Sequence, residues 1–247
     1  MSPRPGVGVA LHLDPTAATP RHLDGGRRLL LAPADRQLAP NLLPVEPYGA
    51  IDLLALADVA AVPAALLAHG RDRRASPPLG VFEQLSSTRR AATPPAGSTL
   101  PAYPDVAPGP PAVVVIFSQP RSLADDAEYN RWYDHVHGPE TLMLPGFTRA
   151  RRFRLAADTE QLTTDVDWPH QPYLTIYDVD NVNAVPTARA AMSWFKGVSA
   201  QFASPALDVP PACWTYVSQE PTDQRAPRPA PQVPSPAPQH PGADEPD

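Results

Sequence analysis

Residues 112–120 read AVVVIFSQP, residues 125–147 read DDAEYNRWYDHVHGPETLMLPGF, and residues 148–156 read TRARRFRLA. The first segment is a continuous apolar run of the length found in buried strands. The second segment has the hydrophobic spacing of a helix, and a Pro-Gly pair at residues 145–146 ends the helical segment before the next strand. We therefore expect a β-α-β unit whose acidic and histidine side chains lie where the helix ends.

The same reasoning assigns elements to the rest of the C-terminal block. We expect strands at residues 113–118, 147–156, 172–178 and 213–218, helices at residues 124–136 and 183–196, and a short helical turn at residues 139–144. This β-α-β-β-α-β order is the ferredoxin-like arrangement. Its antiparallel sheet carries helices on one side and leaves its other face uncovered.

The N-terminal block resembles the C-terminal block. Four matches occur in the same order and at similar offsets: RRLLLA at 27–32 with RRFRLA at 151–156, PY at 47–48 with PY at 172–173, Ile51 with Ile176, and AVP at 61–63 with AVP at 184–186. A self-match of this kind indicates an internal repeat. The first repeat reads as β-β-α-β, because its expected strand at residues 6–13 runs almost directly into the strand at residues 27–32.

The expected fold class is α+β, with two ferredoxin-like repeats that form an intrachain pseudo-dimeric α/β barrel around a shared cavity. Proline-rich segments mark the boundaries, because proline interrupts helices and central strands. We expect a degenerate repeat at residues 1–92, a linker at residues 93–111, a complete repeat at residues 112–219 and a disordered tail at residues 220–247.

Composition narrows the expected partners and location. The net charge is −6, and the grouped arginines 149, 151, 152 and 154 divide between the two faces of an expected strand, so we expect no nucleic-acid partner. No apolar run approaches transmembrane length and the N-terminus lacks the features of a signal peptide, so we expect a cytoplasmic protein without membrane contact. Cys213 is the only cysteine, which excludes an internal disulfide and a cysteine-based zinc site.

The segment YNRWYDHVHGPE at residues 129–140, followed by LPGF at residues 144–147, resembles the EthD-like group of the dimeric α/β-barrel superfamily. In that group a helix with an aromatic residue leads to a histidine, then a proline, then LPG before the second strand. His137 stands at the histidine position. The match runs from residue 112 to about residue 218, and the first half matches only through the internal repeat. This chain departs from the family pattern because one repeat lacks the motif helix, so we expect one site instead of two.

The resemblance implies a class of function and leaves the reaction open. The wider superfamily includes cofactor-free monooxygenases of aromatic polyketides, polyketide cyclases, muconolactone isomerases and fungal dehydratases, together with haem enzymes. We expect a cofactor-independent enzyme (a lyase or dehydratase, cyclase, isomerase or monooxygenase) that acts on an aromatic or polyketide-like small molecule. The alternatives are a haem-binding or peroxidase-like protein on the same scaffold and a non-catalytic module that binds a small molecule. A homodimer is a further possible assembly.

His137 ends the expected helix, where the helix macrodipole favours a protonated imidazole. Asp134 lies three residues earlier, within reach of the ring, so it could hold one ring nitrogen and leave the other for a substrate. We expect His137 to be a general acid or base, Asp134 to orient it, and Tyr133 to donate a hydrogen bond to developing negative charge. The alternative is that Asp134 and His137 form a local pair on the surface.

A metal site is not expected on this helix. His135 points to a different side from His137, because residues two apart on an α-helix diverge by about 200°. A site built from His135, His137 and Glu140 would require the helix to end at His135.

Aromatic residues define the expected binding surface. Tyr129, Trp132, Tyr133 and Val136 share one helical stripe, which we expect to pack on the sheet. On the strand at 172–178 the side chains alternate between two faces. We expect Leu174 and Ile176 to face the helices. We expect Tyr173, Thr175 and Tyr177 to face the cavity, near Arg152 or Arg154. A pocket of tyrosine and arginine suits an anionic or phenolic substrate, although cross-sheet salt bridges are the alternative use of the arginines. The expected substrate-binding residues are Tyr129, Asn130, Trp132, His135, Arg152, Tyr173, Thr175 and Tyr177.

Overall fold

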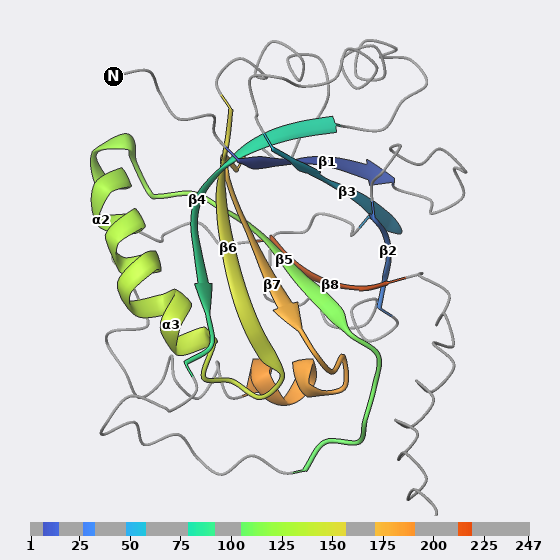
Figure 1. The fold of residues 1–247 in the computed structure, drawn as a ribbon. Coiled ribbons are helices and arrows are strands. Elements are labelled where there is room, and N and C mark those ends of the chain that lie inside the picture. Colours follow the sequence, from blue (N-terminus) through green and yellow to red (C-terminus); the bar gives the residue numbers. More distant parts are fainter. Residues whose placement is uncertain are drawn as a thin grey trace, which may run out of the picture.

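The computed structural model describes residues 7–14, 27–32, 48–57, 79–91, 105–156, 171–190 and 212–218. Within these ranges eight strands close into one barrel (Figure 1). The strands are β1 (Gly8–Asp14), β2 (Arg27–Leu31), β3 (Ala50–Leu56), β4 (Leu79–Arg89), β5 (Ala112–Ser118), β6 (Phe147–Leu155), β7 (Tyr173–Val179) and β8 (Ala212–Ser218). The strands expected at residues 6–13, 27–32, 113–118, 147–156, 172–178 and 213–218 are present, with boundaries that differ by up to two residues. The first block has four strands, one more than the expected β-β-α-β order contains.

The order of strands around the barrel is the same in both halves of the chain. The full order is β1-β3-β2-β8-β5-β7-β6-β4, and β4 closes the barrel by pairing with β1. The first half therefore has the order β4-β1-β3-β2 and the second half has the matching order β8-β5-β7-β6. Antiparallel pairing of β2 with β8 and of β4 with β6 joins the two halves. The α+β barrel expected from the sequence is therefore confirmed at this level, and the two halves share one hydrogen-bonded wall.

The interior of the barrel is a packed apolar core. All eight strands contribute to it, through Val9, Leu11, Leu13, Leu29, Leu31, Ile51, Phe82, Val113, Val115, Phe117, Phe153, Leu174, Ile176, Trp214 and Tyr216. The remaining residues of β5 face outwards and are also buried, because helical segments cover that side. Burial on both faces explains why β5 is a continuous apolar run and does not alternate.

The structure reverses the expected orientation of β7. Leu174 and Ile176 lie in the barrel interior, whereas Tyr173 and Tyr177 pack against the helical segments on the outside. Thr175 lies on the same outer side, since side chains alternate along a strand. The expectation of a polar inter-sheet cavity was wrong because apolar side chains from both halves fill that space. The hydroxyl of Tyr173 has its hydrogen-bond partners, Asn130 and Asp126, on the helix side.

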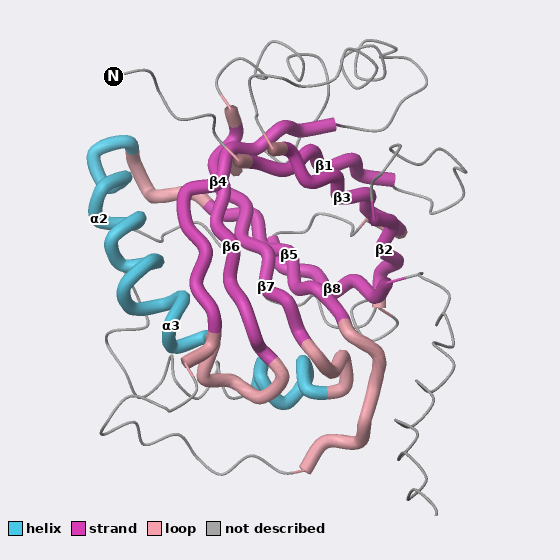
Figure 2. The backbone as a smooth tube through the Cα atoms, viewed as in Figure 1, coloured by secondary structure: helices cyan, strands magenta, loops and turns pink. Residues whose placement is uncertain are grey.

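The helical segment between β5 and β6 lies outside the barrel (Figure 2). It consists of η3 (Leu123–Asp125), α2 (Asp126–Trp132), η4 (Tyr133–His137) and α3 (Gly138–Thr141), which confirms the expected helix at this place. The chain then turns into β6 at Gly146, whose φ of 79° favours glycine. None of the helices in the described ranges is long and apolar enough to cross a membrane.

The other expected elements are described in part. Residues 184–190 are helical, and the rest of the expected helix at 183–196 lies outside the described residues. Residues 105–111 are extended, and the side-chain amides of Asn181 and Asn183 donate to the carbonyl of Ala107 at 3.0 and 3.2 Å. The expected helix of the first repeat, most of the linker and the tail at residues 220–247 fall outside the described ranges.

Replacement of Ile176 by alanine tests the packing of the barrel interior. Ile176 is fully buried among side chains of both halves, so we expect the free energy of unfolding to fall by about 2–4 kcal/mol in urea denaturation. Leu85→Ala on β4 is the control, because Leu85 is 43% exposed and its loss should change stability by less than about 0.5 kcal/mol. Equal stability of the two variants would contradict the interior position of Ile176.

Candidate active site

The helical segment changes its hydrogen-bond register before it ends. Five residues of π-helix, η4, follow α2, and the N–H of Gly138 donates to the carbonyl of Tyr133, five residues back. Pro139 has no N–H, and in an α-helix its ring would collide with the carbonyl four residues before it. A Cβ at Gly138 would lie 2.8 Å from the carbonyl oxygen of Tyr133, so this turn also requires a glycine. The Gly138-Pro139 pair therefore explains the π-helical turn, a feature frequently found at functional sites.

The π-helical turn places His137 over Trp132. The two rings stack with centroids 4.6 Å apart and planes 9° apart, and the ring of Tyr133 meets His137 edge-on at 4.8 Å. On a regular α-helix, residues five apart point about 140° away from each other, so this stack depends on the wider turn. His137 is only 8% exposed, and its ring belongs to the buried aromatic side of the helix.

An aromatic cluster attaches α2 to the sheet. It contains Tyr129, Trp132, Tyr133 and Tyr173, with Val136 packed against it, which confirms the expected stripe. The rings of Tyr129 and Tyr173 lie 4.9 Å apart, and such pairs contribute about 0.5–1.5 kcal/mol beyond the burial of their area. The hydroxyl of Tyr129 also shares a 2.6 Å hydrogen bond with Ser118 at the end of β5.

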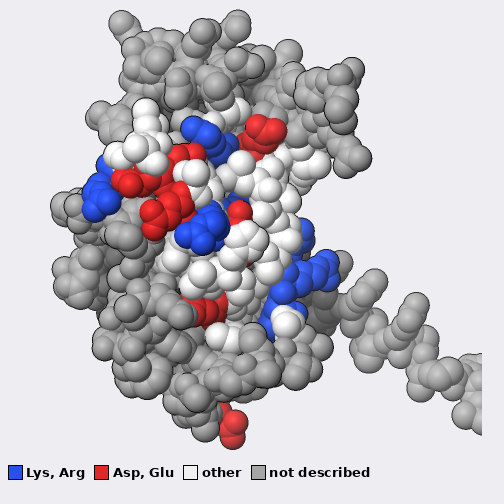
Figure 3. All heavy atoms as spheres, turned by 90° about the vertical axis from the view of Figure 1, so that its left-hand side faces the viewer, with Lys and Arg blue, Asp and Glu red and all other residues white. Residues whose placement is uncertain are grey.

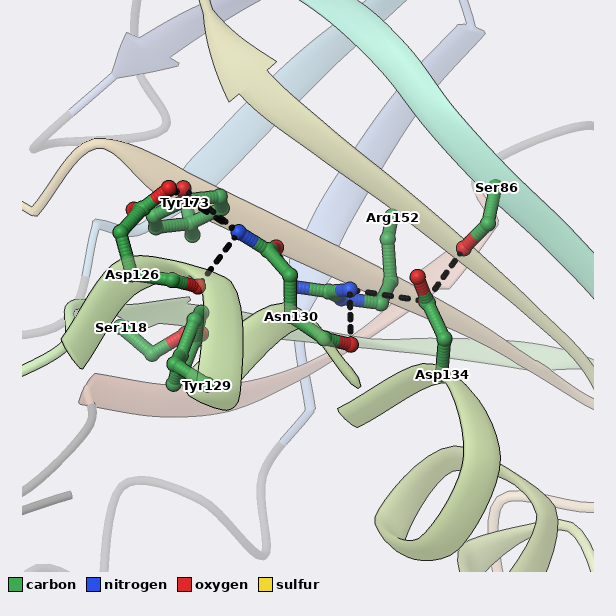
Figure 4. A network of polar contacts seen from close by, with 8 residues as sticks. All are labelled: Ser86, Ser118, Asp126, Tyr129, Asn130, Asp134, Arg152 and Tyr173. Atoms are coloured by element: carbon green, nitrogen blue, oxygen red, sulfur yellow. Dashed lines mark hydrogen bonds and ion pairs between the residues drawn. The ribbon is translucent and has the colours of Figure 1, made fainter. Parts of the chain in front are cut away.

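Arg152 is a buried cation at the centre of this cluster. Its side chain is 3% exposed, and its guanidinium carbon lies 4.4 Å from the ring centroid of Tyr133 and 5.7 Å from that of Tyr173. Nη1 donates to Asp134 Oδ1 at 2.7 Å and Nη2 donates to Asn130 Oδ1 at 2.8 Å (Figure 4). Burial opposes the charge, but the hydrogen bond and charge of Asp134 and the nearby phenols outweigh it. The pKa of Arg152 is raised, and the guanidinium stays charged.

Asp134 turns towards the sheet. Its Oδ1 accepts hydrogen bonds from Arg152 on β6 at 2.7 Å and from Ser86 on β4 at 2.8 Å. The carboxylate thus pairs with these two residues where the sequence predicted a pair with His137. The reason is the π-helical turn, since residues three apart no longer share a face when the turn widens.

Asn130 extends the polar network to β7. Its Nδ2 donates to the hydroxyl of Tyr173 at 3.0 Å and to the backbone carbonyl of Asp126 at 2.9 Å. The hydroxyl of Tyr173 donates in turn to the carboxylate of Asp126. Burial, together with this hydrogen bond, raises the pKa of Tyr173. The network therefore fixes α2 against both β6 and β7 (Figure 4).

A second group of hydroxyls lies further along β7. Thr175 and Tyr177 are fully buried, and within the described residues neither Thr175 Oγ1 nor Tyr177 Oη makes a hydrogen bond. Burial raises the pKa of Tyr177 to about 12, and the nearby hydroxyls of Thr141 and Tyr133 offset part of the rise without reaching hydrogen-bond geometry. Burial also raises the pKa of Tyr133 well above its usual range. These phenols remain protonated donors at neutral pH.

The outer surface beside α2 carries charges of both signs. Figure 3 shows acidic and basic side chains next to one another on the face that α2 occupies. Arg121 and Asp125 form an exposed ion pair at 3.4 Å, and Arg154 lies 4.0 Å from the carboxylate of Asp126. Opposite charges at these separations reduce one another's field.

Most of the predicted site residues meet on one side of the sheet. The residues that gather between the helical segment and strands β6 and β7 are Tyr129, Asn130, Trp132, Tyr133, Asp134, His137, Arg152, Tyr173, Thr175 and Tyr177. His135 is exposed on the helix, which separates it from this group. In the described part of the chain, no three His, Cys, Asp or Glu side chains are grouped so that they could hold a metal ion.

The sequence analysis missed four residues that hydrogen-bond to this group: Ser86, Ser118, Asp126 and Thr141. Helical spacing could have indicated Asp126, because it lies one turn before Asn130. Thr141 donates to the backbone carbonyl of His137 at 2.8 Å, a contact typical of threonine four residues on in a helix. No local signal marks Ser86, which comes from the other half of the chain.

Comparisons with known proteins give only distant similarities. No family model and no curated protein matches the chain. An anthrone oxidase-like protein of known structure has 10% identity and a TM-score of 0.46, over 88% of this chain and 92% of that one. Two proteins named "putative monooxygenase", from Fusobacterium nucleatum and Lactobacillus acidophilus, have 8% identity and TM-scores of 0.40 and 0.42. They cover 88% and 87% of this chain and 94% of their own length.

Replacement of Arg152 by methionine should destabilise the protein. Asp134 and Asn130 would each lose the hydrogen bond from Arg152, and the tyrosine rings would lose the cation, so we expect a loss of about 2–4 kcal/mol in urea denaturation. Arg154→Met on the same strand is the matched control. Arg154 is 51% exposed, so its loss should cost less than about 1 kcal/mol. A similar effect for both variants would mean that Arg152 contributes no more than a surface arginine.

The buried phenols predict a loss of stability at alkaline pH. The folded-state pKa of Tyr177 is about 12, whereas an unfolded tyrosine ionises near pH ~10. The native state thus holds more protons between these values, so stability is complete below pH ~10 and falls as the pH rises towards ~12. Urea denaturation at a series of alkaline pH values should show a shallower fall for Tyr177→Phe than for the wild type. Identical slopes would show that Tyr177 ionises normally in the native state.

Proposed function

We propose that this chain is a small-molecule enzyme that uses acid–base chemistry at His137, without a bound cofactor, on an aromatic or polyketide-like substrate. The observation that carries the proposal is the pair of fully buried hydroxyls, Thr175 Oγ1 and Tyr177 Oη, which make no hydrogen bond within the described residues. Buried polar groups in proteins are almost always hydrogen-bonded, so an exception suggests a group whose hydrogen-bond partner is a ligand or a water molecule.

The proposed chemistry begins with proton transfer to the imidazole of His137. An imidazole changes its charge near neutral pH, which suits a general base. The proton leaves an activated C–H or O–H of the substrate, and the electron pair moves onto a conjugated substrate oxygen. Trp132 covers one face of the imidazole and Tyr133 meets its edge, so these rings hold it in one orientation.

The hydroxyls and Arg152 are suited to stabilise the resulting enolate or phenolate oxygen. Tyr177 and Tyr133 stay protonated because burial raises their pKa values, so they can donate to negative charge as it develops. The charge of Arg152 acts on both phenols. Dehydration, isomerisation, cyclisation and oxygenation can each proceed from such an anion. The proton transfer to His137 is the step that these reactions share.

We infer further that the two halves are ferredoxin-like repeats of one duplicated unit, the second of the EthD-like type. The identical order of strands in the two halves supports this inference. The motif YNRWYDHVHGPE occurs once, in the second half, and it contains the helical residues predicted for the site. We therefore propose one site of this kind for the part of the chain that the structure describes.

Replacement of His137 by glutamine tests the proposed function. Deuterium exchange at the acidic C–H of hydroxyaryl ketones, followed by NMR, reports the shared proton transfer whatever the later steps are. We expect His137→Gln to slow this exchange by about 100-fold or more, with a loss of stability of no more than about 1–2 kcal/mol. Tyr177→Phe should slow it by about 10-fold to 100-fold, because one donor to the oxygen is lost.

Glu128→Ala is the control for this experiment, since Glu128 is an exposed residue of α2. It should exchange deuterium like the wild type. Full exchange by His137→Gln would refute the role of this histidine. A Soret band on addition of haem that disappears in His137→Gln would instead favour the haem-binding alternative.

A further inference from the structure

We infer that the N-terminal half of the chain positions the π-helical turn of the C-terminal half, through the hydrogen bond from Ser86 on β4 to Asp134 on η4. Ser86 is thereby a positioning residue for His137. The contact itself does not depend on the proposed function. Only its effect on turnover rests on that proposal.

A bulge in β4 directs Ser86 towards the helix. Gln84 pairs with Phe153 and Ser86 pairs with Arg152, so Leu85 is one extra residue on β4. Phe82 faces the barrel interior, and strict alternation from Phe82 would point Ser86 inwards as well. The extra residue reverses the alternation and turns Ser86 to the outer side. Bulges are frequent beside active sites, where they redirect a side chain in this way.

Ser86 hydrogen-bonds to the carboxylate of Asp134, which connects β4, β6 and η4. Ser86 Oγ and Arg152 Nη1 donate to the same oxygen of Asp134, at 2.8 and 2.7 Å (Figure 4). Ser86 and Arg152 are also paired residues across the seam between β4 and β6. The carboxylate of η4 is therefore held at the line where the two halves of the chain join.

Such external support matters because the π-helical turn is poorly supported from within. Pro139 lacks the N–H that would bond to the preceding turn, and Gly138 has no side chain that packs. Asp134 is the residue of this turn that forms an ion pair to the sheet, and His137 lies three residues further along the same turn. A shift of Asp134 therefore moves the imidazole relative to Trp132 and the buried hydroxyls.

Proton NMR of the histidine ring tests this inference. The stacked indole of Trp132 should shift the ring protons of His137 upfield, and His137→Gln identifies their signals. We expect Ser86→Ala to lose most of this upfield shift, with an unchanged circular dichroism spectrum. Ser86→Thr retains the hydroxyl and should retain the shift.

Ser87→Ala is the matched control on the same strand. Ser87 accepts a hydrogen bond from Arg149 Nε at 3.0 Å on the exposed side, so its loss should leave the His137 signals in place. In the background of Asp134→Ala, addition of Ser86→Ala should cause no further change, because the serine acts only through the carboxylate. An unchanged upfield shift in Ser86→Ala, or a further change in the double variant, would overturn the inference.

Turnover separates this inference from the proposed function. Where deuterium exchange is measurable, Ser86→Ala should slow it by about 10-fold to 100-fold, as expected for a misplaced base. Loss of the upfield shift in a protein that shows no exchange in any variant would support the positioning role and reject the catalytic one.

Discussion

The interior of this barrel accepts apolar side chains almost exclusively, because eight strands close around a space that their own side chains fill. A polar group placed there would lose its hydrogen bonds to water without finding replacements, at a cost of about 1–3 kcal/mol or more. The constraint decides which faces of β6 and β7 turn inwards, whereas β5 is apolar on both faces. Leu174 and Ile176 turn inwards, and the phenols and Arg152 lie under the helical segment. The candidate site is a consequence of that division.

Under the helical segment, one buried charge organises the polar contacts. Arg152 donates hydrogen bonds to Asp134 and Asn130, and Asn130 donates a hydrogen bond to Tyr173. Because a buried guanidinium is costly unless it is paired, loss of these partners would destabilise the folded protein. The same requirement keeps the helix at a constant distance from β6 and β7, which a site built from helix and strand residues needs.

The two halves contribute differently to this arrangement. The second half supplies the imidazole, the phenols and the buried arginine. The first half closes the barrel and presents β4, whose bulge directs Ser86 towards the carboxylate of Asp134. A half that lacks the helical motif can thus retain a role in the site, because the seam between β4 and β6 runs directly beneath the π-helical turn.

Local sequence pattern by itself determined the four strands of the second block, β1 and β2 of the first block, the helix before His137 and the aromatic stripe on that helix. These features depend on the spacing of apolar and aromatic residues along the chain, which can be read from the amino-acid sequence. Tertiary structure decided which face of β7 is inside, because the answer depends on what the other half contributes to the shared core. It also decided that Asp134 binds Arg152 and Ser86. That outcome requires a π-helical turn and a β-bulge. The π-helical turn changes the helical periodicity and the bulge reverses the alternation of side chains along β4, whereas a prediction from sequence assumes that both are regular.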